Sequence, residues 1–354
     1  MTFVQDNTAF EAWLRDECDV VEGDLKKKHK RMEESPFVFL RATFFRWAKR
    51  IERLCPQLKD VPRVLSVGDA HTENFGTWRD AEGRLVWGIN DFDEAAIIPY
   101  PFDLVRLAAS ARLASMVKVA NGDVAKAILK GYGDGLLQPG PALLDESESW
   151  MREYVACTKK QRRHFWKEVK DYPDATPPAL VAAALESRLP QGASVVRFAS
   201  RVAGGGGLGR PRYVVIAEWR GGWIVREAKA LVPSAWDWAH GVEGEPRFLE
   251  LAEGRFRAPD PYLALSHDFI IRRIAPDARK IDLEDLVGEE LKLDLLEAMG
   301  FDIGAIHAAT RGAAEKITAD LERRDEDWLH GAAKVAAAAV QEDYEEWCNR
   351  RKAC

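Results

Sequence analysis

Residues 64–110 constrain the fold and the chemistry of this chain more than any other stretch. Two short apolar runs in this stretch lead into acidic residues, one into Asp69 and the other into Asp91 and Asp93. Burying several carboxylates costs free energy unless each one is paired or binds a metal. An exposed acidic hairpin is the alternative, but the apolar residues run directly into the acids. The sequence therefore predicts two strands that end in acids at one place.

This pattern favours phosphoryl transfer as the chemistry of the site. In such sites an Asp accepts or orients the proton of the attacking hydroxyl, while an Asn and a second Asp hold Mg²⁺ against the phosphates. Asn74 follows Asp69 closely in this chain, and Asp91 stands at the end of the next apolar run. Residues of the required types are thus present in the required order.

Three motifs in this stretch resemble a known group of enzymes: GDAHTENFG (68–76), NDFDEA (90–95) and PFDLVRL (101–107). They are similar to the GDxHxxN, iDxx and yDLa series of aminoglycoside and choline phosphotransferases, and more closely to the bacterial DUF2252 family. That family is placed among the protein-kinase-like folds and has no settled activity. The resemblance extends over most of the chain.

The resemblance implies a role for each of these polar residues. Asp69 would be the catalytic Asp, Asn74 and Asp91 would be metal ligands, and Asp103 would brace the catalytic loop. Asp93 is the alternative to Asp91 as the metal ligand. The chain departs from the phosphotransferase pattern directly before Gly-Asp, where those enzymes usually have a His and this chain has a Val.

The composition indicates a soluble globular protein. The 354 residues suffice for about two domains or one large bilobed unit, and the fractions of apolar (47%) and charged (31%) residues are ordinary. The net charge of -6 argues against nucleic acid as the main partner. The five cysteines lack CxxC spacing, and the chain has no apolar run long enough to span a membrane. We therefore expect a reduced, cytoplasmic protein without a membrane partner.

The N-terminal part, residues 8–55, has a helical pattern, and Ser35-Pro36 is a typical helix start. Residues 35–41, SPFVFLR, resemble the SPFxFxR signature of DUF2252 proteins. This resemblance implies that Arg41 contacts phosphate or substrate, and an ion pair is its structural alternative. The basic run at residues 26–31 is expected to be a solvated helix face.

A glycine cluster further along the chain matches GxGxxG at Gly204, Gly206 and Gly209. In a dinucleotide-binding fold a helix must follow the glycines. Here Pro211 and the β-branched, aromatic run at residues 213–216 favour a strand instead. A glycine loop between two strands is the kinase pattern, in which the loop covers the nucleotide phosphates and the next strand delivers a Lys.

The next predicted strand, residues 223–230, contains two candidates for this cation. Lys229 is the first choice for the phosphate contact and Arg226 is the alternative. Their side chains point to opposite faces of a strand, so only one of them can point at the nucleotide. An edge-strand Lys in solvent is the structural alternative for Lys229.

Other segments complete the prediction of secondary structure. Residues 121–140 contain several glycines, which predict short helices bounded by turns. Residues 145–172 are helix-prone, and residues 312–353 predict two closing helices. The helix that contains His307 resembles one in aminoglycoside phosphotransferases. This resemblance implies that His307 is a packed structural residue.

Residues 269–287 predict a strand, a linker and the start of a helix. They resemble a DUF2252 segment, and the resemblance implies ligand contacts for Arg272, Arg273 and Lys280.

These predictions together indicate an α+β protein with a bilobed, protein-kinase-like fold. Residues 1–190 would form a helical lobe with the catalytic and metal-binding loops and a helical connector. Residues 191–280 would form a small antiparallel β lobe that binds nucleotide, and residues 281–354 would complete the helical lobe. In ordinary kinases the glycine loop and Lys precede the catalytic Asp. Here they follow it, so the fold is expected to be circularly permuted.

The predicted function is Mg²⁺-ATP-dependent transfer of a phosphoryl group to a hydroxyl or amine of a small-molecule acceptor. Its cofactors would be ATP and Mg²⁺, with Asp69 as the base and Lys229 as the phosphate anchor. Two alternatives stay open. One is transfer of AMP to a protein, and the other is a non-catalytic nucleotide-binding module, which the missing His before Gly-Asp motivates.

Overall fold

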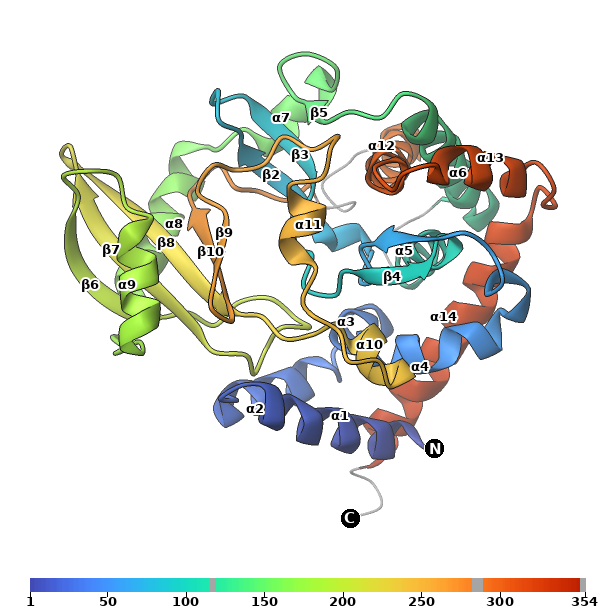
Figure 1. Ribbon diagram of the computed structural model, residues 1–354, viewed down its shortest axis with the longest axis horizontal. Helices are drawn as coiled ribbons and strands as arrows, with labels where there is room; N and C mark the ends of the chain where they lie inside the picture. The colour runs from blue at the N-terminus through green and yellow to red at the C-terminus, as the bar shows by residue number, and fades with distance from the viewer. Residues whose placement is uncertain (115–118, 282–288, 351–354) are drawn as a thin grey trace.

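The computed structural model describes residues 1–114, 119–281 and 289–350 (Figure 1). Its class is α+β, with about 50% helix and small antiparallel sheets. The predicted α+β class is therefore confirmed. Within the described ranges, we find no helix that combines the length and the apolar character needed to cross a membrane.

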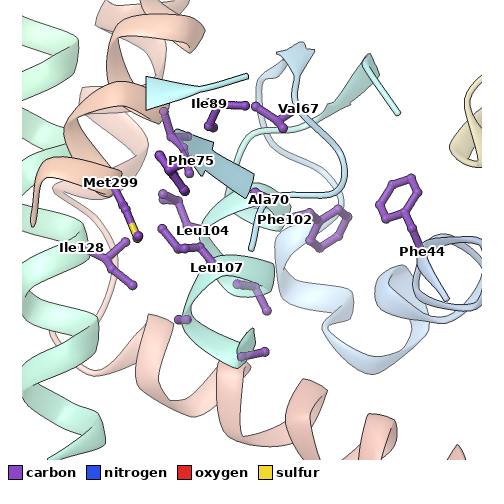
Figure 2. Packing of buried hydrophobic residues seen from close by; sticks show 14 of the residues in the cluster. Phe44, Val67, Ala70, Phe75, Ile89, Phe102, Leu104, Leu107, Ile128 and Met299 are labelled. Carbon is purple, nitrogen blue, oxygen red and sulfur yellow. The ribbon is translucent and has the colours of Figure 1, made fainter. Parts of the chain in front are cut away.

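Most helices pack around one large apolar core, and we call this part the helical body. Figure 2 shows some of that core, where Leu104, Ile128 and Met299 come together from three helices. The predicted start of the third helix is confirmed, because the Ser35 hydroxyl accepts a hydrogen bond of 3.2 Å from the Val38 amide. The helices of the body are α1 (Phe3–Glu17), α2 (Glu22–Arg31), α3 (Pro36–Ala42), α4 (Phe44–Leu54), α5 (Pro101–Leu113), α6 (Asn121–Leu137), α12 (Glu289–Ala308), α13 (Ala313–Leu321) and α14 (Trp328–Asn349).

The prediction of short helices at residues 121–140 is wrong, because α6 is one continuous helix of 17 residues. Its glycines Gly131 and Gly135 face α12, and Gly300 and Gly304 on α12 face α6. A Cβ atom at any of these four positions would clash with the backbone of the other helix. The glycines therefore let two helix backbones approach closely, and the packing gained there offsets the weak helix propensity of glycine.

Two small sheets inside the helical body carry the acidic loops. β1 (Arg63–Ser66) pairs with β4 (Ala96–Pro99), and Asp69 follows β1. β2 (Phe75–Arg79), β3 (Leu85–Ile89) and β5 (Ala142–Leu143) form the second sheet, and Asp91 follows β3. The two acids thus come from different sheets, although both follow a largely buried strand as predicted.

A separate five-stranded antiparallel sheet contains the glycine loop. Its spatial order is β6 (Ser194–Ser200), β7 (Arg212–Trp219), β8 (Gly222–Ala230), β10 (Phe269–Ile274) and β9 (Ala264–Ser266). The glycine loop joins β6 to β7, and a hairpin turn at Gly221, with φ of 77°, joins β7 to β8. The order strand, glycine loop, strand, hairpin, strand is therefore present (Figure 1).

The packing of four helices crosses the predicted lobe boundaries. α8 (Lys159–Asp171) and α9 (Ala179–Ser187), which fall in the predicted helical lobe, pack on opposite faces of the five-stranded sheet. α10 (Ala235–His240) and α11 (Phe248–Ala252) fall in the predicted β lobe but join the core of the helical body through Trp236 and Phe248. A short α7 (Arg152–Val155) precedes α8. The helix start expected near residues 281–287 lies largely outside the described residues.

Candidate active site

One cavity of about 510 Å³ brings most of the predicted site residues together. Its walls come from the helical body, the two acidic loops, the glycine loop and the five-stranded sheet. Lys229 and Asp69, which stand far apart in the sequence, both line it. The other predicted residues that line this cavity are Arg41, Asn74, Asp91, Asp93, Gly204, Gly206, Arg272, Arg273 and Lys280.

The loop that carries Asp69 is braced by Asp103 from α5. The Asp103 carboxylate accepts hydrogen bonds from the backbone amides of Val67 (2.7 Å) and Gly68 (2.9 Å). Gly68 has a φ of +78°, and a Cβ there would clash with the Glu94 carbonyl. The bracing role predicted for Asp103 is therefore confirmed.

His307 from α12 supports the same brace from behind. Its Nε2 atom lies 3.2 Å from Asp103, and its Nδ1 atom lies 2.9 Å from the Tyr132 hydroxyl. The ring is fully buried, as expected for a packed structural residue. The position directly before Gly-Asp is occupied by a Val in this chain. A different histidine, His307 on α12, contacts the Asp103 side chain that braces the loop.

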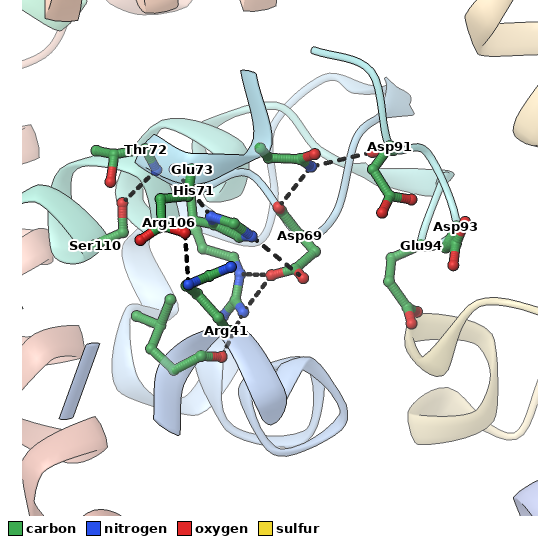
Figure 3. A network of polar contacts seen from close by, with 12 residues as sticks. Arg41, Asp69, His71, Thr72, Glu73, Asp91, Asp93, Glu94, Arg106 and Ser110 are labelled. Carbon is green, nitrogen blue, oxygen red and sulfur yellow. Dashed lines mark hydrogen bonds and ion pairs between the residues drawn. The ribbon is translucent and has the colours of Figure 1, made fainter. Parts of the chain in front are cut away.

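The two carboxylate oxygens of Asp69 have different environments (Figure 3). The Oδ1 atom accepts a hydrogen bond of 2.8 Å from the buried guanidinium of Arg106, and the Oδ2 atom lies 3.9 Å from His71 Nε2. Burial raises the pKa of Asp69, although Arg106 and Arg41 favour the carboxylate. Burial and nearby cations lower the pKa of His71, so its ring is neutral at pH 7. Asp69 is thus held in position by one oxygen and leaves the other toward the cavity.

Asn74 connects the two acidic loops. Its side-chain amide donates hydrogen bonds to the carbonyls of Asp69 (3.1 Å) and Asp91 (3.0 Å). Both hydrogen bonds use the amide nitrogen as the donor. The amide oxygen is therefore the atom of Asn74 that could coordinate a metal ion. Asn74 thus ties the backbones of the two acidic loops together.

Asp91 and Asp93 share one cation, but their pKa values shift in opposite directions. Lys229 Nζ lies 3.3 Å from Asp91 Oδ2 and forms an ion pair with Asp93, while Arg210 reaches Asp93 at 3.0 Å. Burial alone would raise the pKa of Asp91, but the charge of Lys229 lowers it. Burial and the charge of Asp91 raise the pKa of Asp93. Asp91 therefore keeps its negative charge down to a lower pH than Asp93 does.

These residues fit a magnesium ion that arrives with phosphates. The Asp91 side chain is 42% exposed, and Asp93 Oδ1 is buried without a hydrogen-bond partner among the described residues. Mg²⁺ prefers such oxygen ligands and usually combines one or two carboxylates with phosphates and water. Across residues 1–114, 119–281 and 289–350, no three or more His, Cys, Asp and Glu side chains form a metal site by themselves. Asp91, Asp93 and the Asn74 amide oxygen would therefore hold the ion together with its ligand's own oxygens.

The sheet side of the cavity carries a cluster of arginines that the sequence reasoning missed in part. Glu227 is fully buried and accepts from Arg201 (2.6 Å), Arg212 (3.0 Å) and Arg272 (2.7 Å). Three cations against one carboxylate leave net positive charge beside Lys229. Glu227 and Lys229 lie two residues apart on β8, so their side chains point to the same face of the sheet. This alternation is the sequence signal that could have placed Glu227 beside the cavity.

Lys229 and Arg226 point to opposite faces of β8, as predicted. Arg226 lies outside the cavity, where it donates to the Arg188 carbonyl (3.0 Å) and stacks on the Tyr262 ring at 4.0 Å. Its alternative role as the phosphate contact therefore has no geometric support. Lys229 is only 3% exposed, so the structural alternative of a solvent-exposed Lys is wrong.

The glycine loop contacts the N-terminal helices at both ends. Gly204 accepts a hydrogen bond of 2.8 Å from Arg31, and Gly209 accepts one of 2.8 Å from the Val21 amide. Gly209 has a φ of +101°, and a Cβ there would clash with Leu25. Gly209 therefore packs against α2 and does not line the cavity, whereas Gly204 and Gly206 do.

Arg41 forms the ion pair that was its structural alternative, and its contact with phosphate or substrate stays a prediction. Its guanidinium forms an ion pair of 2.6 Å with Glu73 and also lines the cavity. The basic run on α2 differs from its prediction in one residue: Lys26, Lys27 and Lys30 are exposed, but Lys28 is buried in the cavity wall.

The comparisons with known proteins match one part of the chain. Residues 21–136 match the family model described as "Uncharacterized protein conserved in bacteria (DUF2252)". The matched part contains Asp69, Asn74, Asp91 and Asp103 and leaves out the glycine loop and Lys229. No curated protein and no solved structure matches the chain.

Proposed function

We propose that this protein is a Mg²⁺-ATP-dependent phosphotransferase with a circularly permuted, kinase-like arrangement. The observation that carries the proposal is the convergence of Asp69, Asp91, Lys229 and the glycine loop on one cavity. In kinases a glycine loop covers the phosphates, a Lys on the third strand contacts them, and an Asp and an Asn hold the metal. This chain offers each of these parts in one place.

The connectivity supports the permutation. The sheet runs through the glycine loop, the hairpin and Lys229 in the kinase order, but the acidic loops precede it in the chain. α12, which follows the sheet, packs beside the Asp69 loop through His307 and Asp103. This is the place that the helix before the catalytic loop would take in an unpermuted kinase.

The cations on the sheet side suit a nucleoside triphosphate. Lys229 and the positive cluster of Arg201, Arg212 and Arg272 lie along one face of the sheet, beside the glycine loop. Bound Mg²⁺ would neutralise part of the phosphate charge. Asp91 and Asn74 would hold the ion, while backbone amides of the glycine loop would cover the phosphates.

Asp69 would handle the proton of the acceptor. The acceptor oxygen forms a bond to the γ-phosphorus while the bond from that phosphorus to the bridging oxygen of ADP breaks. Asp69 Oδ2 takes the hydroxyl proton and later returns it to water. Arg106 fixes the other oxygen, so the carboxylate is oriented before the acceptor binds.

Thermal unfolding with nucleotides and metals tests the proposal. Mg²⁺-ATP at about 100 times its dissociation constant should stabilise the protein by roughly 2.7 kcal/mol.

Analysis of the reaction products distinguishes the candidate activities. ADP as the product would support phosphoryl transfer, whereas an AMP adduct would support nucleotidyl transfer. Binding without any product would indicate a non-catalytic nucleotide-binding protein. Unchanged melting with all nucleotides and metals would contradict every nucleotide reading.

A further inference from the structure

Lys28 is a buried cation in the cavity wall that the proposed phosphoryl transfer does not use. It lies on α2, is only 2% exposed and lines the cavity. Its ammonium group makes no hydrogen bond or salt bridge within the described part of the chain, and its contacts are the ring faces of Phe10 (5.7 Å) and Phe45 (6.0 Å). These distances lie at the outer limit of a cation–π interaction. A charge held in this way is expensive unless a ligand pairs with it.

The surroundings of Lys28 form a distinct end of the cavity. Three aromatic rings and one leucine give it an apolar wall, and they come from α1 and α4: Phe10, Leu14, Phe44 and Phe45. Burial lowers the pKa of Lys28 to about 8, even though the carboxylates of Glu11, Glu94 and Asp69 favour the charged form. Lys28 therefore still carries a charge at neutral pH.

The other cations on this side of the cavity already have partners. Arg106 is paired with Asp69, Arg210 with Asp93 and Glu94, and Arg41 with Glu73. Glu94 further accepts a hydrogen bond of 2.7 Å from the Ala235 amide. The Glu11 carboxylate near Lys28 is likewise engaged, since it accepts a hydrogen bond of 2.9 Å from Asn7 and contacts the His29 ring. Among these cations of the cavity wall, all in the described part of the chain, Lys28 is thus the one without a carboxylate partner.

Lys28 lies on the side of the cavity where the acceptor is proposed to bind. The Phe44 ring of its apolar wall lies 5.0 Å from the guanidinium of Arg106, which pairs with Asp69, the residue proposed to take the acceptor proton. Lys229, on the nucleotide side, pairs instead with Asp91 and Asp93. A ligand group that meets Lys28 therefore belongs to the molecule whose hydroxyl lies at Asp69.

We propose that Lys28 binds an anionic group of the acceptor, which makes the acceptor a small hydroxyl compound with an apolar body and a carboxylate or phosphate. This inference rests on the proposed phosphotransferase function. The apolar wall packs against the body of the acceptor, Lys28 pairs with its anion, and the hydroxyl lies at Asp69 Oδ2. A lysine suits both anions, because its ammonium group acts as a point charge.

A matched set of probes tests this specificity on the full-length protein. The probes are 4-(hydroxymethyl)benzoate, the corresponding benzamide and the corresponding benzylamine, which share one ring and one hydroxymethyl group and carry a negative, a neutral and a positive second substituent. Their affinities are measured by calorimetry, with and without Mg²⁺ and a non-hydrolysable ATP analogue. The benzoate should bind at least about tenfold more tightly than the amide, and the amine should bind most weakly. A phosphonate probe on the same ring then separates preference for a phosphate from preference for a carboxylate.

Three variants assign the preference to Lys28. Lys28→Met should bind the benzoate and the amide equally, while Lys28→Arg should keep the preference. Lys26→Met, which removes an exposed charge from the same helix, should behave as the wild type. A benzoate preference that survives in Lys28→Met would overturn the proposal, as would equal binding of all three probes by the wild type.

The nucleotide measurements separate this inference from the proposed function. Lys28→Met should bind the ATP analogue as the wild type does, because Lys28 meets the acceptor. Weaker analogue binding with an unchanged benzoate preference would assign Lys28 to the nucleotide and refute the inference alone. A wild type that prefers the benzoate but does not bind the ATP analogue would refute the proposed function and leave an anion site at Lys28.

Discussion

The loops that carry Asp69 and Asp91 both follow a buried strand, yet the protein treats their carboxylates in opposite ways. Asp69 is fixed by the buried Arg106, and burial raises its pKa. Asp91 is 42% exposed to the cavity, and the charge of Lys229 lowers its pKa. The same local pattern thus gives one carboxylate suited to take a proton and one suited to stay charged. The difference comes from the side chains that surround each loop.

The largest expected effect is on turnover in Asp69→Asn. A residue that accepts the proton in the transition state contributes about 10²–10⁴-fold to the rate, so kcat should fall by that factor. Binding of Mg²⁺-ATP should stay the same, because Asp91 is the residue proposed to hold the metal. Steady-state kinetics with calorimetry measures both quantities, and Asp60→Asn at an exposed site is the control. Unchanged turnover would exclude Asp69 as the base.

Asp91→Asn should have its main effect on Mg²⁺-ATP binding, whereas Asp69→Asn should affect turnover. Without its negative charge the loop holds Mg²⁺ poorly, so the stabilisation of roughly 2.7 kcal/mol expected at about 100 times the dissociation constant should largely vanish. Thermal unfolding of the variant with and without Mg²⁺-ATP measures this loss. If Asp93→Asn loses the stabilisation and Asp91→Asn keeps it, Asp93 is the metal ligand. Equal loss in Asp69→Asn and Asp91→Asn would contradict the separation of roles.

A smaller effect is expected from the brace behind the Asp69 loop. Asp103→Asn leaves one of the amides of Val67 and Gly68 without an acceptor in a buried place, which costs roughly 1–3 kcal/mol of stability. Chemical denaturation measures this change in the free energy of unfolding. Asp60→Asn is again the matched control, and equal stability of the two variants would show that Asp103 does not brace the loop.

The smallest effect concerns pH. Only the carboxylate form of Asp69 can accept a proton, so turnover should fall as the pH drops through its raised pKa, above the ordinary Asp value of about 3.9. Asp91 has a lowered pKa and stays ionised over that range, so Mg²⁺-ATP binding should fall only at lower pH. Turnover and Mg²⁺-ATP affinity, each measured over the same range of pH, show whether the two quantities fall at different pH values. Coincident profiles would mean that one group controls both.

Part of this molecule follows from local sequence alone. Apolar runs that lead into Asp69 and Asp91 predict strands that end in acids, and Ser35 starts its helix by capping a nearby amide. Strand alternation separates Lys229 from Arg226, because successive side chains point to opposite faces. These features depend on neighbours in the chain, so the sequence shows them directly.

The remaining features were decided by tertiary contacts. Glycines that predict turns at residues 121–140 instead form a close interface, because the backbone of α12 packs against them. One lysine of the basic run, Lys28, is buried because its helix packs against the Phe10 and Phe45 rings of α1 and α4. His307 reaches the Asp103 brace from a distant helix. Local patterns cannot encode these outcomes, since each depends on which surface, distant in the sequence, packs against the residue.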